Sequence, residues 1–290
     1  MVEARELTVG QGSAAWRYVS DPRLFLGALS ALLLQVAHPT VGAGVRDHSD
    51  FEARPWVRLY RTIDWVNLMV YGGFDAVEVG QRLRRMHRRI RGVNPDGSRY
   101  HALEPGAYAW VHGTLVWSVV NGQRMFGSGM RPDEVHRLYR EWLGLGRLIG
   151  VRAGDLPGGW DEFLDYFDDM ISTRLEHTGT VDTVLRVAAR PARPELLPGW
   201  TEPLWRAGRV PMTRLLTLTG IGATPPALRA RLGLRWTGRQ DRALRTVATA
   251  SRALTPVLPE SVRVNGPAYL RARRAAIARD EFAPARYRTE

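Results

Sequence analysis

A histidine inside a cationic segment is the first candidate for chemistry, because imidazole binds metals and titrates near neutral pH. His87 lies in the run from Arg82 to Gly92, which holds six arginines in eleven residues. Apolar side chains around this run recur at spacings of four, three and four: Val79, Leu83, Met86 and Ile90. This spacing predicts one apolar helical stripe, which His87 borders. An imidazole beside a buried face needs a hydrogen bond, a metal or a cofactor as its partner.

A second group of chemically capable side chains precedes this helix. The residues Arg58, Arg61, Thr62, Trp65 and Met69 follow spacings of three, one, three and four. These spacings place them on one face of a helix. One interpretation is a surface edge where guanidinium groups extend to water. The other is a pocket wall where the cations meet a ligand carboxylate or a polarised oxygen.

Three further histidines are candidates by their surroundings. His112 stands in the apolar stretch "AWVHGTLVW", so we expect it to be buried, and such a histidine is more often bonded to backbone than a ligand. His38 precedes Pro39, which predicts that it ends a core helix. His48 stands beside acidic residues near an expected junction between a loop and a helix.

Residues that typically start or end helices recur along the whole chain. We therefore expect helices to position the candidate residues. Asp21 and Pro22 predict the start of an apolar core helix that ends near His38. The other expected helices cover residues 55–71, 75–92, 105–122, 132–149, 160–176, 182–189, 202–218, 226–232, 238–254 and 267–279. "SRYHAL" is the best candidate for a short strand. "ARPARPELLPGW" is the best candidate for a break between parts of the compact helical body. The pattern predicts an all-α protein with a single main helical domain.

Composition narrows the function classes. All 41 basic residues are arginine, the net charge is +12, and this pattern is typical of a GC-rich coding bias. No helix-turn-helix, zinc-finger or RNA-binding signature is present, so we expect no specific nucleic-acid partner. The absence of cysteine excludes disulfides, thiolate metal sites and iron–sulfur clusters. The sequence also lacks the zinc-protease, dinucleotide-binding, phosphate-loop, nucleophile-elbow and di-iron motifs.

The N-terminus and the most apolar run bear on location. The first sixteen residues have no apolar core of a secretory signal. The run from Leu24 to Ala37 has 14 residues, fewer than the roughly 20 that span a bilayer. We therefore expect a buried helix, no transmembrane segment and a cytoplasmic protein.

Five segments in order carry a family resemblance. They are "LLLQVAHPTVGAGVRDHSDF", "RPWVRLYRTIDWVNLMVYG", "RLRRMHRRIRG", "YHALEPGAYAWVHGTLVWS" and "LTPVLPESVR". The chain resembles the haem-dependent oxygenases that include latex-clearing rubber oxygenases and the fungal oxygenase of mycophenolic acid biosynthesis. The resemblance predicts an N-terminal extension at 1–14, a catalytic domain at 15–265, and a C-terminal helix and tail at 266–290.

The resemblance implies a globin-like helical core around haem b, with His87 as the iron ligand. It implies that O₂ and a hydrophobic small molecule are the substrates, with oxidative cleavage of a C=C bond in an isoprenoid-like compound as one candidate reaction. Arg58, Arg61 and Thr62 are then the candidate catalytic residues, acting on a polarised oxygen. His38, His112 and Trp65 are further candidate cofactor contacts.

The chain departs from the rubber-cleaving enzymes at Arg61, where those enzymes carry a lysine that can occupy the far side of the iron. Arginine stays protonated and is a poor iron ligand. The far side is therefore predicted to be open, water-bound or closed by another residue.

Two other functions stay open at this point. One is a non-haem metal enzyme that uses some of His38, His48, His87 and His112. The other is a non-catalytic helical protein that binds a hydrophobic ligand. The sequence leaves open the substrate, the electron donor and the oligomeric state.

Overall fold

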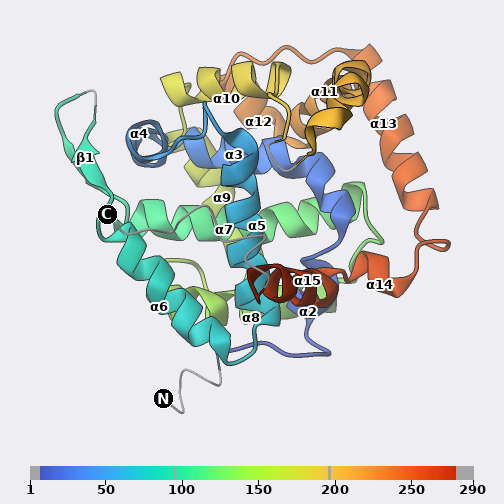
Figure 1. The fold of residues 1–290 in the computed structure, drawn as a ribbon. Coiled ribbons are helices and arrows are strands. Elements are labelled where there is room, and N and C mark those ends of the chain that lie inside the picture. The colour runs from blue at the N-terminus through green and yellow to red at the C-terminus, as the bar shows by residue number, and fades with distance from the viewer. Residues whose placement is uncertain (1–6, 95, 195–196, 279–290) are drawn as a thin grey trace.

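The computed structural model describes residues 7–94, 96–194 and 197–278, and within these residues the chain is helical except for one two-stranded sheet. The predicted all-α fold is confirmed. Helix α7 (Pro105–Met125) crosses the middle of the molecule, and the other long helices surround it (Figure 1). The carboxylate of Glu104 caps α7 by accepting hydrogen bonds from the N–H groups of Gly106 and Ala107. Trp110 and Val116 are fully buried along α7.

The apolar segment before Pro39 forms the core helix that the sequence predicts. It begins as a 3-10 helix, η1 (Pro22–Gly27), which continues into α3 (Ala28–Val36). Pro39 ends this helix but also starts another, α4 (Pro39–His48), because proline fits the first helical position. His48 therefore ends a helix, whereas the sequence predicted that it lies near the start of one.

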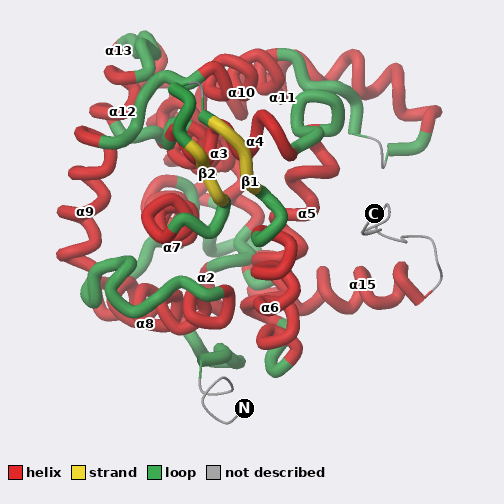
Figure 2. The backbone as a smooth tube through the Cα atoms, turned by 90° about the vertical axis from the view of Figure 1, so that its left-hand side faces the viewer, coloured by secondary structure: helices red, strands yellow, loops and turns green. Residues whose placement is uncertain are grey.

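The two helices that carry the candidate site follow. Helix α5 (Pro55–Tyr71) has the predicted bounds, and Gly73 leaves the helix in a left-handed conformation. Helix α6 (Asp75–His87) ends five residues before the predicted end at Gly92. The chain then forms β1 (Arg91–Val93), which pairs antiparallel with β2 (Arg99–His101) beside α4 (Figure 2).

The other described elements complete the body. They are α2 (Ala14–Tyr18), α8 (Pro132–Ile149), α9 (Trp160–Thr173), α10 (Gly179–Ala189), η2 (Gly199–Thr201), α11 (Glu202–Ala223), α12 (Pro226–Arg231), α13 (Gly238–Ala253), α14 (Glu260–Arg263) and α15 (Gly266–Ala278). The predicted break lies between α10 and α11. The last part of the predicted C-terminal tail, residues 279–290, lies outside the described residues.

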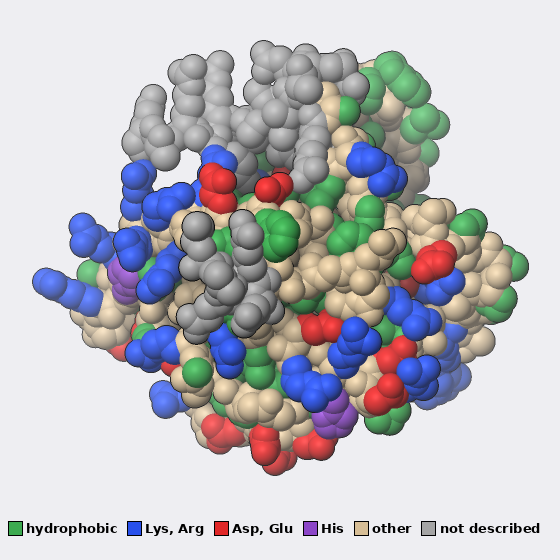
Figure 3. Space-filling model, turned by 90° about the horizontal axis from the view of Figure 1, so that it is seen from below, with side chains coloured by type: hydrophobic (Ala, Val, Ile, Leu, Met, Phe, Trp, Pro, Cys, Tyr) green, Lys and Arg blue, Asp and Glu red, His purple; other side chains and the backbone are tan. Residues whose placement is uncertain are grey.

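Two features bear on the membrane and nucleic-acid predictions. No single helix in the described part of the chain has the length and apolar content to cross a bilayer. The pair formed by η1–α3 and α4 reaches that length together but is bent by 104° at its break. Arginine side chains on the lower face are interspersed with acidic side chains (Figure 3).

Candidate functional site

His87 is the last residue of α6, and its ring lies between the backbone of α6 and helix α7. Its Nδ1 lies 2.8 Å from the carbonyl oxygen of Leu83, one turn earlier. The ring meets the ring of Tyr108 on α7 edge-on, with 5.4 Å between centroids. Because a carbonyl only accepts, Nδ1 carries the hydrogen and Nε2 carries the lone pair. Among the described residues nothing hydrogen-bonds Nε2.

The surroundings keep this imidazole neutral. Burial lowers the pKa of His87 below its ordinary value, since it penalises the charged form. The Leu83 carbonyl opposes that shift, and the cationic Arg58 of α5 adds to it. A neutral imidazole with a free Nε2 is the form that binds a metal.

Helix α5 brings two of the predicted catalytic residues together. The guanidinium of Arg58 donates to the hydroxyl of Thr62 one turn later, and that hydroxyl donates to the Arg58 carbonyl at 3.2 Å. Arg61 is directed elsewhere, with its Nη1 4.0 Å from the carboxylate of Asp50. Trp65 lies half-buried further along the same helix. Arg58, Thr62 and His87 therefore form one group across α5 and α6, while Arg61 forms a separate ion pair.

His38 occupies the turn between α3 and α4 and has an unusual buried nitrogen. Its Nδ1 is inaccessible to solvent and has no hydrogen-bond partner among the described residues. Burial lowers the pKa of His38, while Glu104 raises it and Arg174 lowers it. A buried polar atom without a partner costs free energy, so such atoms are rare outside sites that meet a ligand or water. This supports a contact with a bound group.

His112 has a different environment. Its Nε2 lies 2.8 Å from the carbonyl oxygen of Trp142, and the two rings stack with 5.3 Å between centroids. The indole N–H of Trp142 donates in return to the His112 carbonyl at 3.0 Å. Complete burial lowers the pKa of His112 to about 4. The structure thus places His112 between α7 and α8 with the geometry of a core histidine that joins two helices.

The sequence patterns did not predict two contacts of His87 that the structure shows. Tyr108 was not among the predicted site residues, yet its ring packs against His87. Leu83 was named only as part of an apolar stripe, yet its carbonyl holds the imidazole. The spacing of four between Leu83 and His87 was the available signal for the second contact. The contact with Tyr108 depends on how α6 packs near α7, which no local pattern encodes.

Some apolar side chains of α3, α5 and α7 are only partly buried. On α3 these include Leu29 and Leu32, on α5 Leu59 and Ile63, and on α7 Leu115. Interior helices normally bury such residues fully, as α3 does with Leu33 and Leu34. Of these helices, α3 and α7 pack against each other.

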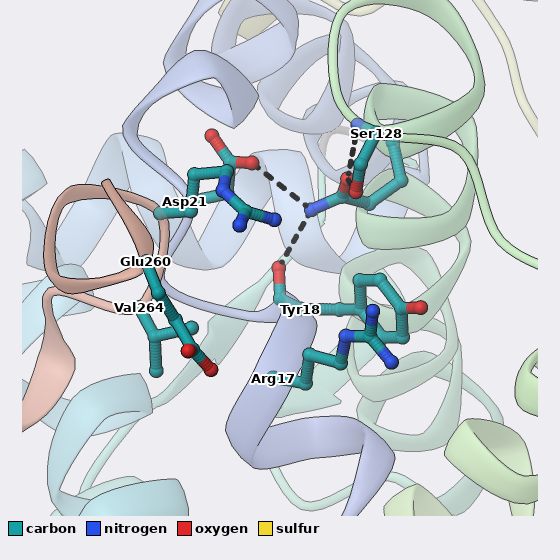
Figure 4. Close-up of a pocket in the computed structure, with 8 residues that line it drawn as sticks. Arg17, Tyr18, Asp21, Ser128, Glu260 and Val264 are labelled. Carbon is teal, nitrogen blue, oxygen red and sulfur yellow. Dashed lines mark hydrogen bonds between the residues drawn. The ribbon is translucent and has the colours of Figure 1, made fainter. Parts of the chain in front are cut away.

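Metal-ligating residues do not cluster in the described part of the chain. No group of three or more histidine, aspartate or glutamate side chains there could hold a metal ion. A separate polar pocket of about 140 Å³ lies between α2, the end of α7 and α14, where Arg17, Asp21, Ser128 and Glu260 surround it (Figure 4). Its Gln123 bonds to the Tyr18 carbonyl and to Ser128 N–H, both at 3.1 Å. None of the predicted site residues lines it.

These observations define a mainly helical protein in which the imidazole of His87 has an Nε2 without a hydrogen-bond partner among the described residues and feels the charge of the Arg58 guanidinium. Residues 16–253 match the family described as ER-bound oxygenase mpaB/B′/Rubber oxygenase, catalytic domain, and the chain belongs to this family. The resemblance seen in the sequence is confirmed, and the protein is an oxygenase, an oxidoreductase that uses O₂. No curated protein and no solved structure matches the chain.

Proposed function

We propose that this chain is a haem b-dependent oxygenase in which His87 is the iron ligand. The observation that carries the proposal is the hydrogen-bonding state of the imidazole. Nδ1 is held by the Leu83 carbonyl, and Nε2 has no partner among the described residues. Metal-bound histidines commonly donate their other ring N–H to a carbonyl, which fixes the tautomer and the ring orientation. The lowered pKa of His87 favours the same neutral form.

The donor set favours a porphyrin over a bare metal ion. A zinc or non-haem iron site usually takes three or more ligating side chains, and the described residues form no such group. An iron porphyrin supplies four nitrogen ligands itself and needs one axial histidine from the protein. The Nε2 of His87 can serve as that single axial ligand, so the donor set matches haem better than the non-haem alternative.

Other residues of the fold also suit this cofactor and an apolar substrate. The incompletely buried residues of α3, α5 and α7 would cover a flat hydrophobic group. The orphaned Nδ1 of His38 would gain a partner from a bound group or its water. Haem, when bound, would supply the iron that activates O₂.

Arg58 and Thr62 have the chemistry to assist that reaction. A guanidinium keeps its charge at all physiological pH values and can stabilise negative charge that develops on a reacting oxygen. The hydrogen bond to Thr62 holds Arg58 on the face of α5 near His87. Arg61, paired with Asp50, would act at the rim. The substrate we propose is a hydrophobic alkene of isoprenoid type, with oxidative cleavage of its double bond.

Haem reconstitution tests this proposal. Protein purified from haem-supplemented cells should show a Soret band, and pyridine haemochromogen analysis should give one haem for each chain. His87→Ala should lose the band. The matched control is His177→Ala, because His177 is exposed and pairs with Asp182 at 2.7 Å, and this variant should keep it.

Three results would contradict the proposal. A band retained in His87→Ala would exclude His87 as the ligand. Stoichiometric iron or zinc without porphyrin would assign the chain to the non-haem enzymes. Neither metal nor haem, together with tight binding of a hydrophobic anion, would make it a ligand-binding protein.

A further inference from the structure

Exposed apolar side chains gather in one stretch of the chain, from η2 to Leu215 of α11. Trp200 is 74% exposed and Leu204 67% exposed, and Val210 and Leu215 are also exposed. Large apolar residues scattered singly over a surface are normal, but a contiguous group marks an interaction site. This group, Trp200, Leu204, Val210 and Leu215 with Pro211, is called the α11 face below.

The helical spacing shows that the α11 face is the solvent side of its helix. Leu204, Pro211 and Leu215 recur at intervals of seven and four, which places them on one stripe, and all three are exposed. The opposite side packs inward, where Trp205 meets Trp56 of α5 edge-on with 6.1 Å between ring centroids. An ordinary surface helix turns its polar side to water. Here the water-facing side is apolar.

The charges beside the α11 face are positive. Arg206, Arg209 and Arg214 are exposed on the same helix, and Glu202 is its one acidic residue. Glu202 is already paired with Arg206 at 2.9 Å. Arg209 and Arg214 have no acidic partner within the described residues. Exposed leucine and tryptophan flanked by arginine are typical of helices that lie at the surface of an anionic bilayer.

We propose that the α11 face docks this protein onto an anionic lipid bilayer, with α11 lying parallel to the membrane surface. Charge complementarity favours lipid over a second copy. Two copies that meet through this face would add the unpaired arginines of both chains to an interface where α11 supplies one acidic residue, Glu202, which is already paired with Arg206. Anionic phosphate headgroups instead offer each guanidinium a bidentate partner.

The docked orientation would bring the candidate site close to the lipid. Trp205 links α11 to Trp56 at the start of α5, the helix that carries Arg58 and Thr62. A hydrophobic substrate dissolved in the bilayer would then meet the protein next to this helix. This consequence rests on the proposed function, whereas the docking itself does not.

Flotation of the full-length protein with vesicles tests the docking. The vesicles are phosphatidylcholine alone, or phosphatidylcholine with phosphatidylglycerol at seven to three. We expect binding to the anionic vesicles that weakens as salt rises. Leu204→Glu should reduce the partition coefficient at least about tenfold, since it places a charge in the apolar stripe. Arg214→Gln, beside the apolar stripe, should reduce it about fivefold and flatten the salt dependence, whereas Arg209→Gln, on the side of α11 that carries Trp205, should change it less.

A matched control separates docking through the α11 face from non-specific binding to vesicles. Val257 is 70% exposed but lies beyond α13, away from the α11 face, so Val257→Glu should bind as the wild type does. Equal binding by all variants, or no binding to anionic vesicles, would overturn the proposal. A dimer in light scattering that Leu204→Glu dissociates, without vesicle binding, would assign the face to a second copy. His87→Ala should still float with the vesicles, so failure of the haem proposal is recognisable separately.

Discussion

His87, His38 and His112 are three imidazoles that the fold holds in their neutral form. Burial is the leading cause in each case, because it penalises the imidazolium. Their hydrogen bonds differ. His87 has one nitrogen held by a carbonyl and one free, His38 has a buried orphan, and His112 bonds to the backbone of α8. The pKa is lowered in all three histidines, but their hydrogen bonds differ, so a lowered pKa alone does not assign a role to any of them.

Stability should fall on acidification. The pKa of His112 is about 4 in the folded protein and about 6.5 when unfolded. Between these values the unfolded state binds more protons, so the free energy of unfolding decreases as pH falls from about 7 to about 4. His112 alone accounts for about 3 kcal/mol, and His38 and His87 act in the same direction. Urea unfolding at several pH values measures this slope.

The control for this slope is His112→Asn, which removes the titrating group. Its stability should depend less steeply on pH than that of the wild type. An unchanged slope in the variant would show that His112 does not titrate as its buried position requires.

Replacing His38 should separate a ligand contact from a structural one. His38→Leu removes a buried nitrogen that has no partner, so the free energy of unfolding should change by less than about 1 kcal/mol. His112→Leu instead removes a hydrogen bond and leaves the Trp142 carbonyl unsatisfied, which should cost about 1–3 kcal/mol. Haem affinity should fall in the His38 variant and not in the His112 variant. Equal destabilisation of the two would contradict this assignment.

Much of the candidate site was predictable from residue spacing, but the partners were not. The spacing of four between Arg58 and Thr62 predicted a shared face, and the structure joins them. The same reasoning put Arg61 with them, yet its side chain extends to Asp50, which precedes the helix. The orphaned nitrogen of His38 depends on packing among α3, α4 and α7, which no local pattern contains.

At the scale of elements, helix ends were predictable where they depend on local signals. Pro55 and Gly72 bound α5 at the expected residues because both act within one turn. The predicted end of α6 at Gly92 was wrong, since Arg91–Val93 pair with Arg99–His101 instead. Gly92 also lies against Tyr100, whose hydroxyl would be 2.7 Å from an added Cβ. Strand pairing is non-local, so helical periodicity alone could not predict it.

Close packing of α6 on α8 should be sensitive to a single methyl group. A Cβ at Gly80 would lie 2.6 Å from the carbonyl oxygen of Leu148, a backbone atom that cannot move cheaply. Gly80→Ala should therefore destabilise the protein by about 1–3 kcal/mol, despite the better helix propensity of alanine. Chemical denaturation measures the change.

The control is another glycine inside a helix. Nothing lies within 4 Å of a Cβ at Gly208 on α11, so Gly208→Ala should stabilise by up to about 1 kcal/mol. If both variants gained stability, the contact between α6 and α8 would be looser than the structure has it.

At the scale of the whole molecule, a buried ion pair ties the start of the body to its last third. Asp21 accepts hydrogen bonds from the backbone N–H and guanidinium of Arg23, with the closest at 2.7 Å. The same guanidinium donates to the hydroxyl of Thr255, after α13, at 2.6 Å. The sequence predicted Asp21 as a helix cap, and it is one. Its link to α13 follows from tertiary packing.

Removing only the Asp21 carboxylate should lower the free energy of unfolding more than removing both charges of the pair. Asp21→Ala leaves the buried Arg23 charge without its carboxylate, which should lower the free energy of unfolding by about 3–5 kcal/mol. The double variant Asp21→Ala with Arg23→Met should lose less, because no uncompensated charge is left buried. Thermal unfolding of the three proteins compares them. Equal losses in both variants would show that Arg23 is not desolvated.

The central claim is that the free nitrogen of His87 binds haem iron. Its most direct test is the absorption spectrum of His87→Gly before and after addition of free imidazole. The account predicts that the Soret band of the wild type is lost or displaced in the variant, and that imidazole restores it by replacing the missing side chain. A spectrum of His87→Gly that matches the wild type without imidazole would contradict the claim.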